Sequence, residues 1–176
     1  VLFSPAGTDD IKGMNGSGKA PNGLSAQIMR DKGHHIVPTE GVDSVTIPGA
    51  IDAFCQLSND WGTLGLDAIL APAIKYAREG VPVAPKVAFD WSNAVHRLHA
   101  SAKSKFSQSG QAPKVGTMFT APSQARVLEK VALNGRDGFY CGSVAVDMVT
   151  SLRALGGSHT LEDFAKQRAF YTNPIT

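Results

Sequence analysis

The stretch Gly13–Pro21, GMNGSGKAP, decides the first question about the fold, which is whether the chain is a P-loop nucleotide-binding protein. The P-loop pattern is Gly, four residues, Gly, Lys and then Ser or Thr, whose hydroxyl holds Mg²⁺. Gly18 and Lys19 fit this pattern, but Ala20 stands where the hydroxyl is needed. Pro21 follows, in place of an apolar helix whose first amides would face the phosphates. We therefore expect no nucleotide site here.

The composition of the 176 residues is that of a globular domain or a large piece of one. The net charge is +2 and no basic run stands out, so nucleic acid is not an expected partner. No apolar run approaches the roughly 20 residues that a membrane span needs, so no span is expected. Cys55 and Cys141 are far apart and are interpreted as buried small hydrophobic residues, neither a bridge nor a zinc site. The sequence leaves the cellular compartment open.

Short strands are predicted in the first part of the chain and helices in the rest. Residues 1–3 and 11–14 flank a turn-rich connector and predict a hairpin, and 36–38 and 45–47 are further short extended pieces. Helical periodicity predicts helices from Pro48 to about residue 60, over 66–80, over 91–102, after Pro122 and after Gly142. The helix over 66–80 is expected to break or start afresh at Pro72. A last helix is predicted over 161–167, where Thr160 and Asp163 form a capping box. Residues 101–117 are expected to form an exposed loop, and 169–171 an extended exit. The predicted fold class is helix-rich α+β.

Isolated motifs for catalysis or metal binding are weak. His96 and His99 are three residues apart and could reach one metal, but no carboxylate lies one turn away. His34–His35 follow a turn and are interpreted as surface residues. Ser17 lacks the glycine two residues before it that a nucleophile elbow needs. These residues identify no self-contained catalytic centre.

Four stretches follow the order and spacing of one family's motifs. They are Asn15–Pro21, Val45–Phe54 with Trp61–Leu64, Ala71–Gly80, and Gly138–Gly142 with Gly156–Gly157 and Thr160–Phe164. Together they resemble the large subunit of the γ-glutamyltranspeptidase family, in the branch whose loop reads Gly-Ser-Gly-Lys-Ala-Pro, and the resemblance covers most of the chain.

The resemblance implies an N-terminal-nucleophile hydrolase with a four-layer αββα core, of which this chain would be the helix-rich part. Such proteins are precursors that cut themselves, and the new N-terminal Thr of the small subunit is the nucleophile, with its own α-amino group as a possible base. We expect residues 1–176 to be a middle segment of the large subunit within a single domain. The N-terminal region and the small subunit, its heterodimer partner, would lie outside it. The resemblance places no catalytic residue in this chain, and we expect no cofactor and no metal.

The loop departs from the family pattern at one informative position. Transpeptidases of the family carry an Arg-Glu pair where this sequence has Ser17 and Gly18, and that Arg grips the α-carboxylate of the γ-glutamyl donor. A forked guanidinium–carboxylate contact contributes about 1.5–3 kcal/mol, which a serine hydroxyl does not replace. Lys19 offers a point charge two positions later, with a different reach. Loops of this type resemble those of acylase and amidohydrolase branches.

Three functional hypotheses follow. In the first, the chain is part of an amidohydrolase or acylase that works through an acyl-enzyme, and Asn15, Ser17 and Lys19 line the acyl pocket. Ser17 would hydrogen-bond the acyl group, and Lys19 would attract a carboxylate of the small-molecule substrate. The alternatives are a genuine γ-glutamyltransferase or glutathione hydrolase with a different anchor, and an inactive family member with a binding or structural role. The loop could also be a glycine-rich turn whose lysine is simply solvated.

Overall fold

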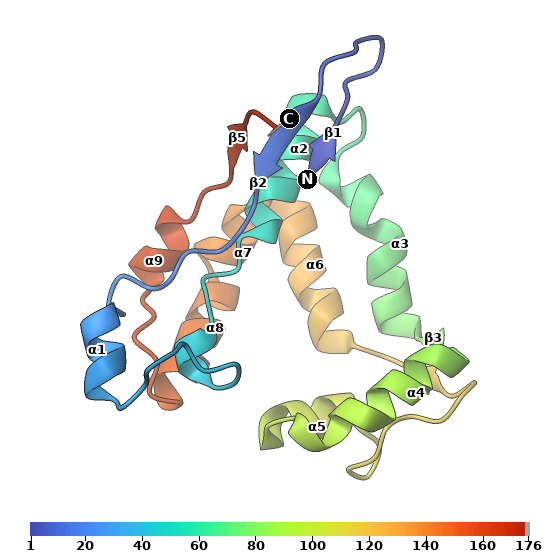
Figure 1. The fold of residues 1–176 in the computed structure, drawn as a ribbon. Helices are drawn as coiled ribbons and strands as arrows, with labels where there is room; N and C mark the ends of the chain where they lie inside the picture. Colours follow the sequence, from blue (N-terminus) through green and yellow to red (C-terminus); the bar gives the residue numbers. More distant parts are fainter. Residues whose placement is uncertain (175–176) are drawn as a thin grey trace. The chain divides into compact units, whose positions relative to one another are not determined.

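The computed structural model describes residues 1–174, which divide into two compact units. The first unit comprises residues 1–68 together with the chain from 130 onward, and the second comprises residues 69–129. Figure 1 draws the chain and labels its helices and strands where there is room.

A three-stranded antiparallel sheet lies in the first unit, in the order β1 (Leu2–Phe3), β2 (Lys12–Asn15) and β5 (Phe170–Thr172). The hairpin predicted from the turn-rich connector is confirmed, since Leu2 pairs with Gly13. The extended exit is confirmed as β5, which places Phe170 opposite Asn15. The two ends of the described chain therefore meet on the middle strand, and β2 leads directly from the sheet into the Gly-Ser-Gly-Lys-Ala-Pro stretch.

The helices of the first unit are α1 (Ala26–Asp31), the 3-10 turn Val42–Ser44, α2 (Ala50–Trp61), α7 (Asp137–Tyr140), α8 (Ser143–Ala154) and α9 (Leu161–Lys166). The helices predicted from Pro48, after Gly142 and over 161–167 are confirmed as α2, α8 and α9, whereas α1, α7 and the 3-10 turn were not predicted. The capping box that begins α9 is confirmed, with Thr160 and Asp163 bonded to each other's backbone and side chain. Residues 36–38 and 45–47, predicted as extended pieces, form no strand. The core of this unit includes Met14, Ala53 and Ala169, so β2, α2 and the approach to β5 pack together.

The second unit is built from helices and one short ribbon. It holds most of α3 (Leu66–Glu79) and of α6 (Pro122–Asn134), with α4 (Pro85–Ala94), the 3-10 turn Val95–Arg97, α5 (Ala100–Phe106) and the pair β3 (Val81–Pro82) and β4 (Met118–Phe119).

Two predictions about helices in this region are wrong. Pro72 does not break α3, which is continuous from Leu66 to Glu79. Pro72 and Ala68 are both exposed, so the carbonyl that loses its N–H partner is open to water. Residues 91–102 are not one helix, because α4 ends at Ala94 and Leu98 is extended.

An aromatic cluster explains the second departure. The chain turns back so that Trp91 packs edge-on against Phe119, with ring centroids 4.8 Å apart, and its Nε1 donates to the Phe106 carbonyl at 2.8 Å. These contacts outweigh a continuous helix. They also correct the prediction of an exposed loop over 101–117, whose first part is α5. Within residues 1–174, no helix is long and apolar enough to cross a membrane.

Candidate functional site

The loop Asn15–Pro21, which is predicted to bind substrate and is called the substrate loop below, leaves β2 and runs closely along the segment that starts α2. A side chain at Gly16 would collide with the Cβ of Ala53, and one at Gly18 would collide with the carbonyl oxygen of Ile47. Gly49 in turn lies against the Ser17 backbone. The glycines are therefore needed for close packing of two backbones, which is a different role from the phosphate cradle that their spacing mimics.

Hydrogen bonds within the loop and to distant residues hold the loop in place. The Ile47 N–H donates to the Lys19 carbonyl at 2.9 Å, and the Ser17 N–H donates to Oδ1 of Asn15 at 2.9 Å. Pro21 is fully buried, and the Asn22 N–H donates to Oδ1 of Asp163 at 3.1 Å. The end of the loop is thus tied to the capping box of α9.

That capping carboxylate has a perturbed acidity. Burial works against the charged form of Asp163, but hydrogen bonds from Thr160 and Asn22 outweigh it and hold the pKa of Asp163 below its ordinary value of 3.8. The anchor of the loop is therefore an ionised, fully hydrogen-bonded carboxylate at neutral pH.

The three predicted site residues are all exposed, but they are not equivalent. Asn15 and Ser17 line an open hollow of about 620 Å³ whose apolar walls include Leu2, Ala53 and Phe54. Lys19 does not line it. The Oδ1 of Asn15 already accepts one hydrogen bond in the turn to Ser17, and the amide nitrogen of Asn15 can donate to a ligand. Within residues 1–174, neither the Ser17 hydroxyl nor the Lys19 ammonium has a hydrogen bond or an ion pair.

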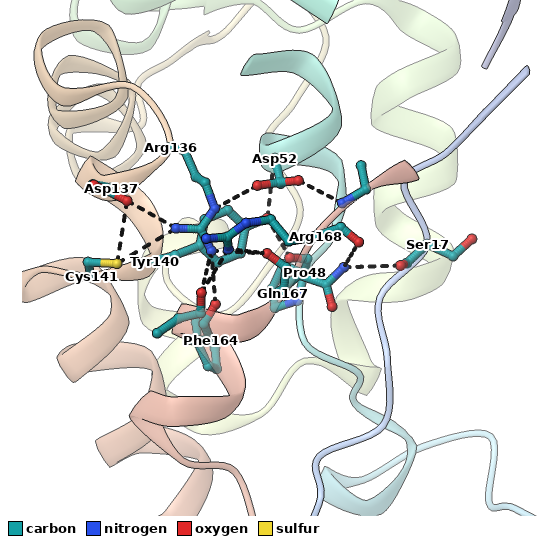
Figure 2. Close-up of polar contacts among 12 residues, drawn as sticks. Ser17, Pro48, Asp52, Arg136, Asp137, Tyr140, Cys141, Phe164, Gln167 and Arg168 are labelled. Carbon is teal, nitrogen blue, oxygen red and sulfur yellow. Dashed lines mark hydrogen bonds and ion pairs between the residues drawn. The ribbon is translucent and has the colours of Figure 1, made fainter. Parts of the chain in front are cut away.

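A polar network that sequence reasoning missed lies behind the loop (Figure 2). Arg136, at the start of α7, donates through Nε to Oδ1 of Asp52 at 2.6 Å, and its side chain is 17% exposed against 5% for the carboxylate. The same guanidinium donates to the carbonyls of Ala165 at 2.7 Å and Gln167 at 3.0 Å. Arg136 therefore joins α2 and α7 to the chain that leaves α9.

Tyr140 completes the network on the other side of Asp52. Its hydroxyl donates to the Pro48 carbonyl at 2.6 Å and accepts from the Asp52 N–H at 3.2 Å. The Arg136 guanidinium lies 4.7 Å from the centre of the Tyr140 ring. Burial raises the pKa of Tyr140 to about 12. The hydroxyl is therefore a structural hydrogen-bond donor and stays protonated at neutral pH.

Two further buried polar side chains contact the loop or the segment before α2 that packs against it. Gln167 is 1% exposed, and its side-chain amide bonds the backbone of Ser17 and Lys19. His159 is also 1% exposed, and its Nε2 donates to the Val45 carbonyl at 2.9 Å. Nothing in the local sequence marks either residue as buried; of the network residues, Asp52 and Tyr140 lie inside the quoted motifs, whereas Arg136 and Gln167 do not.

The histidines and cysteines are placed mostly as surface groups. His96 and His99 are exposed, and Nε2 of His34 lies 3.9 Å from Asp43. The prediction of two buried cysteines is wrong for Cys141, which is exposed at the end of α7 and whose thiol donates to Oδ1 of Asp137 at 3.5 Å, and Cys55 is only half-buried. Among residues 1–174, no three His, Cys, Asp or Glu side chains gather closely enough to hold a metal ion.

The fold defines a class of protein. This helix-rich α+β chain has the architecture of part of an N-terminal-nucleophile hydrolase, as its match to the solved cephalosporin acylase from Bacillus halodurans shows. That structure matches 99% of this chain and 34% of its own, with a TM-score of 0.90 and 34% identity. The Gamma-glutamyltranspeptidase family model matches residues 1–176, and the chain belongs to this family. The resemblance found in the sequence is thereby confirmed.

Two curated relatives extend the comparison. The glutathione hydrolase-like YwrD proenzyme of Bacillus subtilis is 30% identical over 172 residues, covering 96% of this chain and 32% of the relative. The oxamate amidohydrolase proenzyme of Klebsiella pneumoniae is 30% identical over 183 residues, covering 99% of this chain and 34% of the relative. The chain thus spans about a third of the length of these relatives. The family therefore includes relatives named for glutathione hydrolysis, for acylase activity and for amide hydrolysis.

Proposed function

We propose that residues 1–176 form the substrate-loop segment of an amidohydrolase or acylase of this family, which cleaves a small acyl amide. The acyl-enzyme would form on the N-terminal Thr of a separate small subunit, produced when a precursor cuts itself. The observation that supports this choice is the exposed Ser17 hydroxyl, which stands at the position of the carboxylate-gripping Arg in transpeptidases. A hydroxyl there favours a neutral acyl oxygen over an α-carboxylate.

Each loop residue has a distinct role in this proposal. The Ser17 hydroxyl donates to an oxygen of the acyl group, and the amide nitrogen of Asn15 supplies a second donor from the same side. The apolar walls of the hollow, including Phe54, receive the carbon chain of the acyl group. Lys19 lies outside the hollow and attracts a carboxylate carried at the far end of the substrate, through a point charge.

The main alternative is genuine γ-glutamyl hydrolysis or transfer. The name of the glutathione hydrolase-like relative, which covers nearly the whole chain, favours it. In that case the α-carboxylate must be held by another group, since Ser17 offers no fork. The third possibility, an inactive member with a binding role, predicts an uncut precursor.

A substrate panel separates these functions. The product of the complete gene is assayed for kcat/KM with a γ-glutamyl anilide, a glutaryl anilide and the amide of a small oxo acid. We expect the last two classes to be turned over faster. Lys19→Ala should raise KM about tenfold for substrates with a terminal carboxylate and leave KM for neutral acyl amides unchanged. Lys114→Ala, at an exposed lysine of the second unit, is the matched control.

Two results would overturn the proposal. Preferred turnover of the γ-glutamyl anilide would establish the alternative. Mass spectrometry that finds one uncut chain, together with no turnover of any amide, would establish the inactive member.

A further inference from the structure

We infer that Gln167 is the positioning residue of the substrate loop, and this inference rests on the proposed function of that loop. Gln167 lies just beyond α9, 150 residues from Ser17 in the sequence. Its side-chain amide hydrogen-bonds the backbone of the loop. It would act through Ser17 and Lys19, whose side chains it leaves exposed.

The contacts of the Gln167 amide are complementary to the loop backbone. Its Nε2 donates to the Ser17 carbonyl at 3.3 Å, and its Oε1 accepts from the Lys19 N–H at 3.4 Å. A donor and an acceptor on one planar group thus bind both sides of Gly18, much as a neighbouring strand would. On its opposite side the Lys19 carbonyl accepts from Ile47. This part of the loop is held between a side chain and a backbone segment, although residues 16–21 belong to no sheet.

The amide is required because only a group that both donates and accepts satisfies the two backbone atoms. An ionised carboxylate could not donate to Ser17, and an apolar side chain of equal size could do neither. Glycine at 16 and 18 gives the free loop a large conformational entropy. The two hydrogen bonds from the Gln167 amide, called the clamp below, therefore select one arrangement of Ser17 and Lys19 from many.

Gln167 is itself held rigidly. Its carbonyl accepts from Arg136, and its N–H donates to the Phe164 carbonyl at 3.1 Å. Two residues further, the Ala169 N–H donates to Oδ2 of Asp52 at 2.6 Å. The Arg136–Asp52 pair therefore positions Gln167, and Gln167 positions the loop (Figure 2).

The test compares Gln167→Met, Gln167→Glu and, as a matched control at an exposed glutamine of α1, Gln27→Met, each in the processed full-length enzyme. With rates expressed per titrated active site, Gln167→Met should raise KM roughly five- to thirtyfold and change kcat less than twofold. The Gln27→Met variant should match the wild type. A purely structural role would instead lower the melting temperature and leave KM per active site unchanged.

Gln167→Glu supplies a pH readout. A neutral carboxyl donates and accepts as the amide does, and burial raises its pKa. The KM ratio of this variant to the wild type should therefore fall toward one as the pH is lowered from 8 to about 5, while the ratio for Gln167→Met stays flat. A flat ratio for both variants would overturn the inference.

Hydrogen exchange keeps the clamp and the proposed function separable. The Lys19 amide should exchange at least severalfold faster in Gln167→Met than in the wild type, whether or not any amide is hydrolysed. If the wild type hydrolyses none of the panel, the proposed function fails while exchange still tests the clamp. Unchanged exchange at Lys19 in an active enzyme overturns the clamp alone.

Discussion

Arg136 and Asp52 lie 84 residues apart in the sequence, and Nε of Arg136 donates to Oδ1 of Asp52 at 2.6 Å. The second oxygen of Asp52 accepts from the Ala169 N–H. One carboxylate therefore connects α2, the start of α7 and the approach to β5. Because the carboxylate is almost fully buried, removing its charge leaves the guanidinium without its partner in a poorly solvated place.

Asp52→Asn should lower the free energy of unfolding by about 3–5 kcal/mol, the usual cost of breaking a buried ion pair on one side. Urea denaturation of the full-length protein measures it. Asp90→Asn makes the same change in an exposed pair with Lys86 and should cost less than about 0.5 kcal/mol. Equal losses at the two sites would show that burial of the Arg136–Asp52 pair has no energetic consequence.

The stability of the protein should fall at alkaline pH because of Tyr140. Its pKa is raised by burial to about 12 in the folded state and is about 10 when unfolded. The stabilising contribution of the neutral hydroxyl is therefore fully present below pH 10 and is lost as the pH rises through about 12, because the unfolded chain releases the proton first. The free energy of unfolding, measured at several pH values between 8 and 11, gives the slope of stability against pH.

Tyr140→Phe should remove this part of the slope and cost about 1–3 kcal/mol at neutral pH, since the Pro48 carbonyl loses its donor. Tyr76→Phe, at an exposed tyrosine, should preserve the slope. A slope that survives in Tyr140→Phe would mean that other groups carry it.

Gly18→Ala should displace the substrate loop, because its Cβ would overlap the Ile47 carbonyl. We expect a loss of about 1–3 kcal/mol from overpacking, together with an increase in KM. Thermal unfolding and steady-state kinetics measure the two effects. Ala20→Ser adds one atom at the neighbouring exposed position and should change neither. Equal stability and KM for Gly18→Ala and Ala20→Ser would contradict the close approach of Gly18 to the Ile47 carbonyl.

Local patterns predicted much of the first unit. The hairpin, the helices after Gly142 and Thr160 and the extended exit all depend on turn residues, caps and periodicity that lie within a few positions of one another. The failures lie where contacts between distant residues decide. Trp91 and Phe119 outweigh a continuous helix over 91–102, and solvent exposure lets α3 accommodate Pro72.

The site was predicted only in part for the same reason. The loop could be found because its glycines and its Ala-Pro end are adjacent in the sequence. Gln167, His159 and the Arg136–Asp52 pair act across long separations, and a single glutamine or histidine in a sequence has no periodic pattern that marks it as buried. The exposure of Asn15, Ser17 and Lys19 agrees with their predicted role, which stays a prediction.

The contact between Gly18 and Ile47 has a consequence for how substrate preference can change. The loop is fixed through its main chain, by Ile47 on one side and Gln167 on the other, and none of these bonds involves the side chains at 17 and 19. We expect those two positions to accept many residue types without refolding of the surrounding structure. If the proposed function holds, a library randomised at these two codons should therefore yield mostly folded proteins with an altered substrate range, which makes the loop a natural starting point for directed evolution.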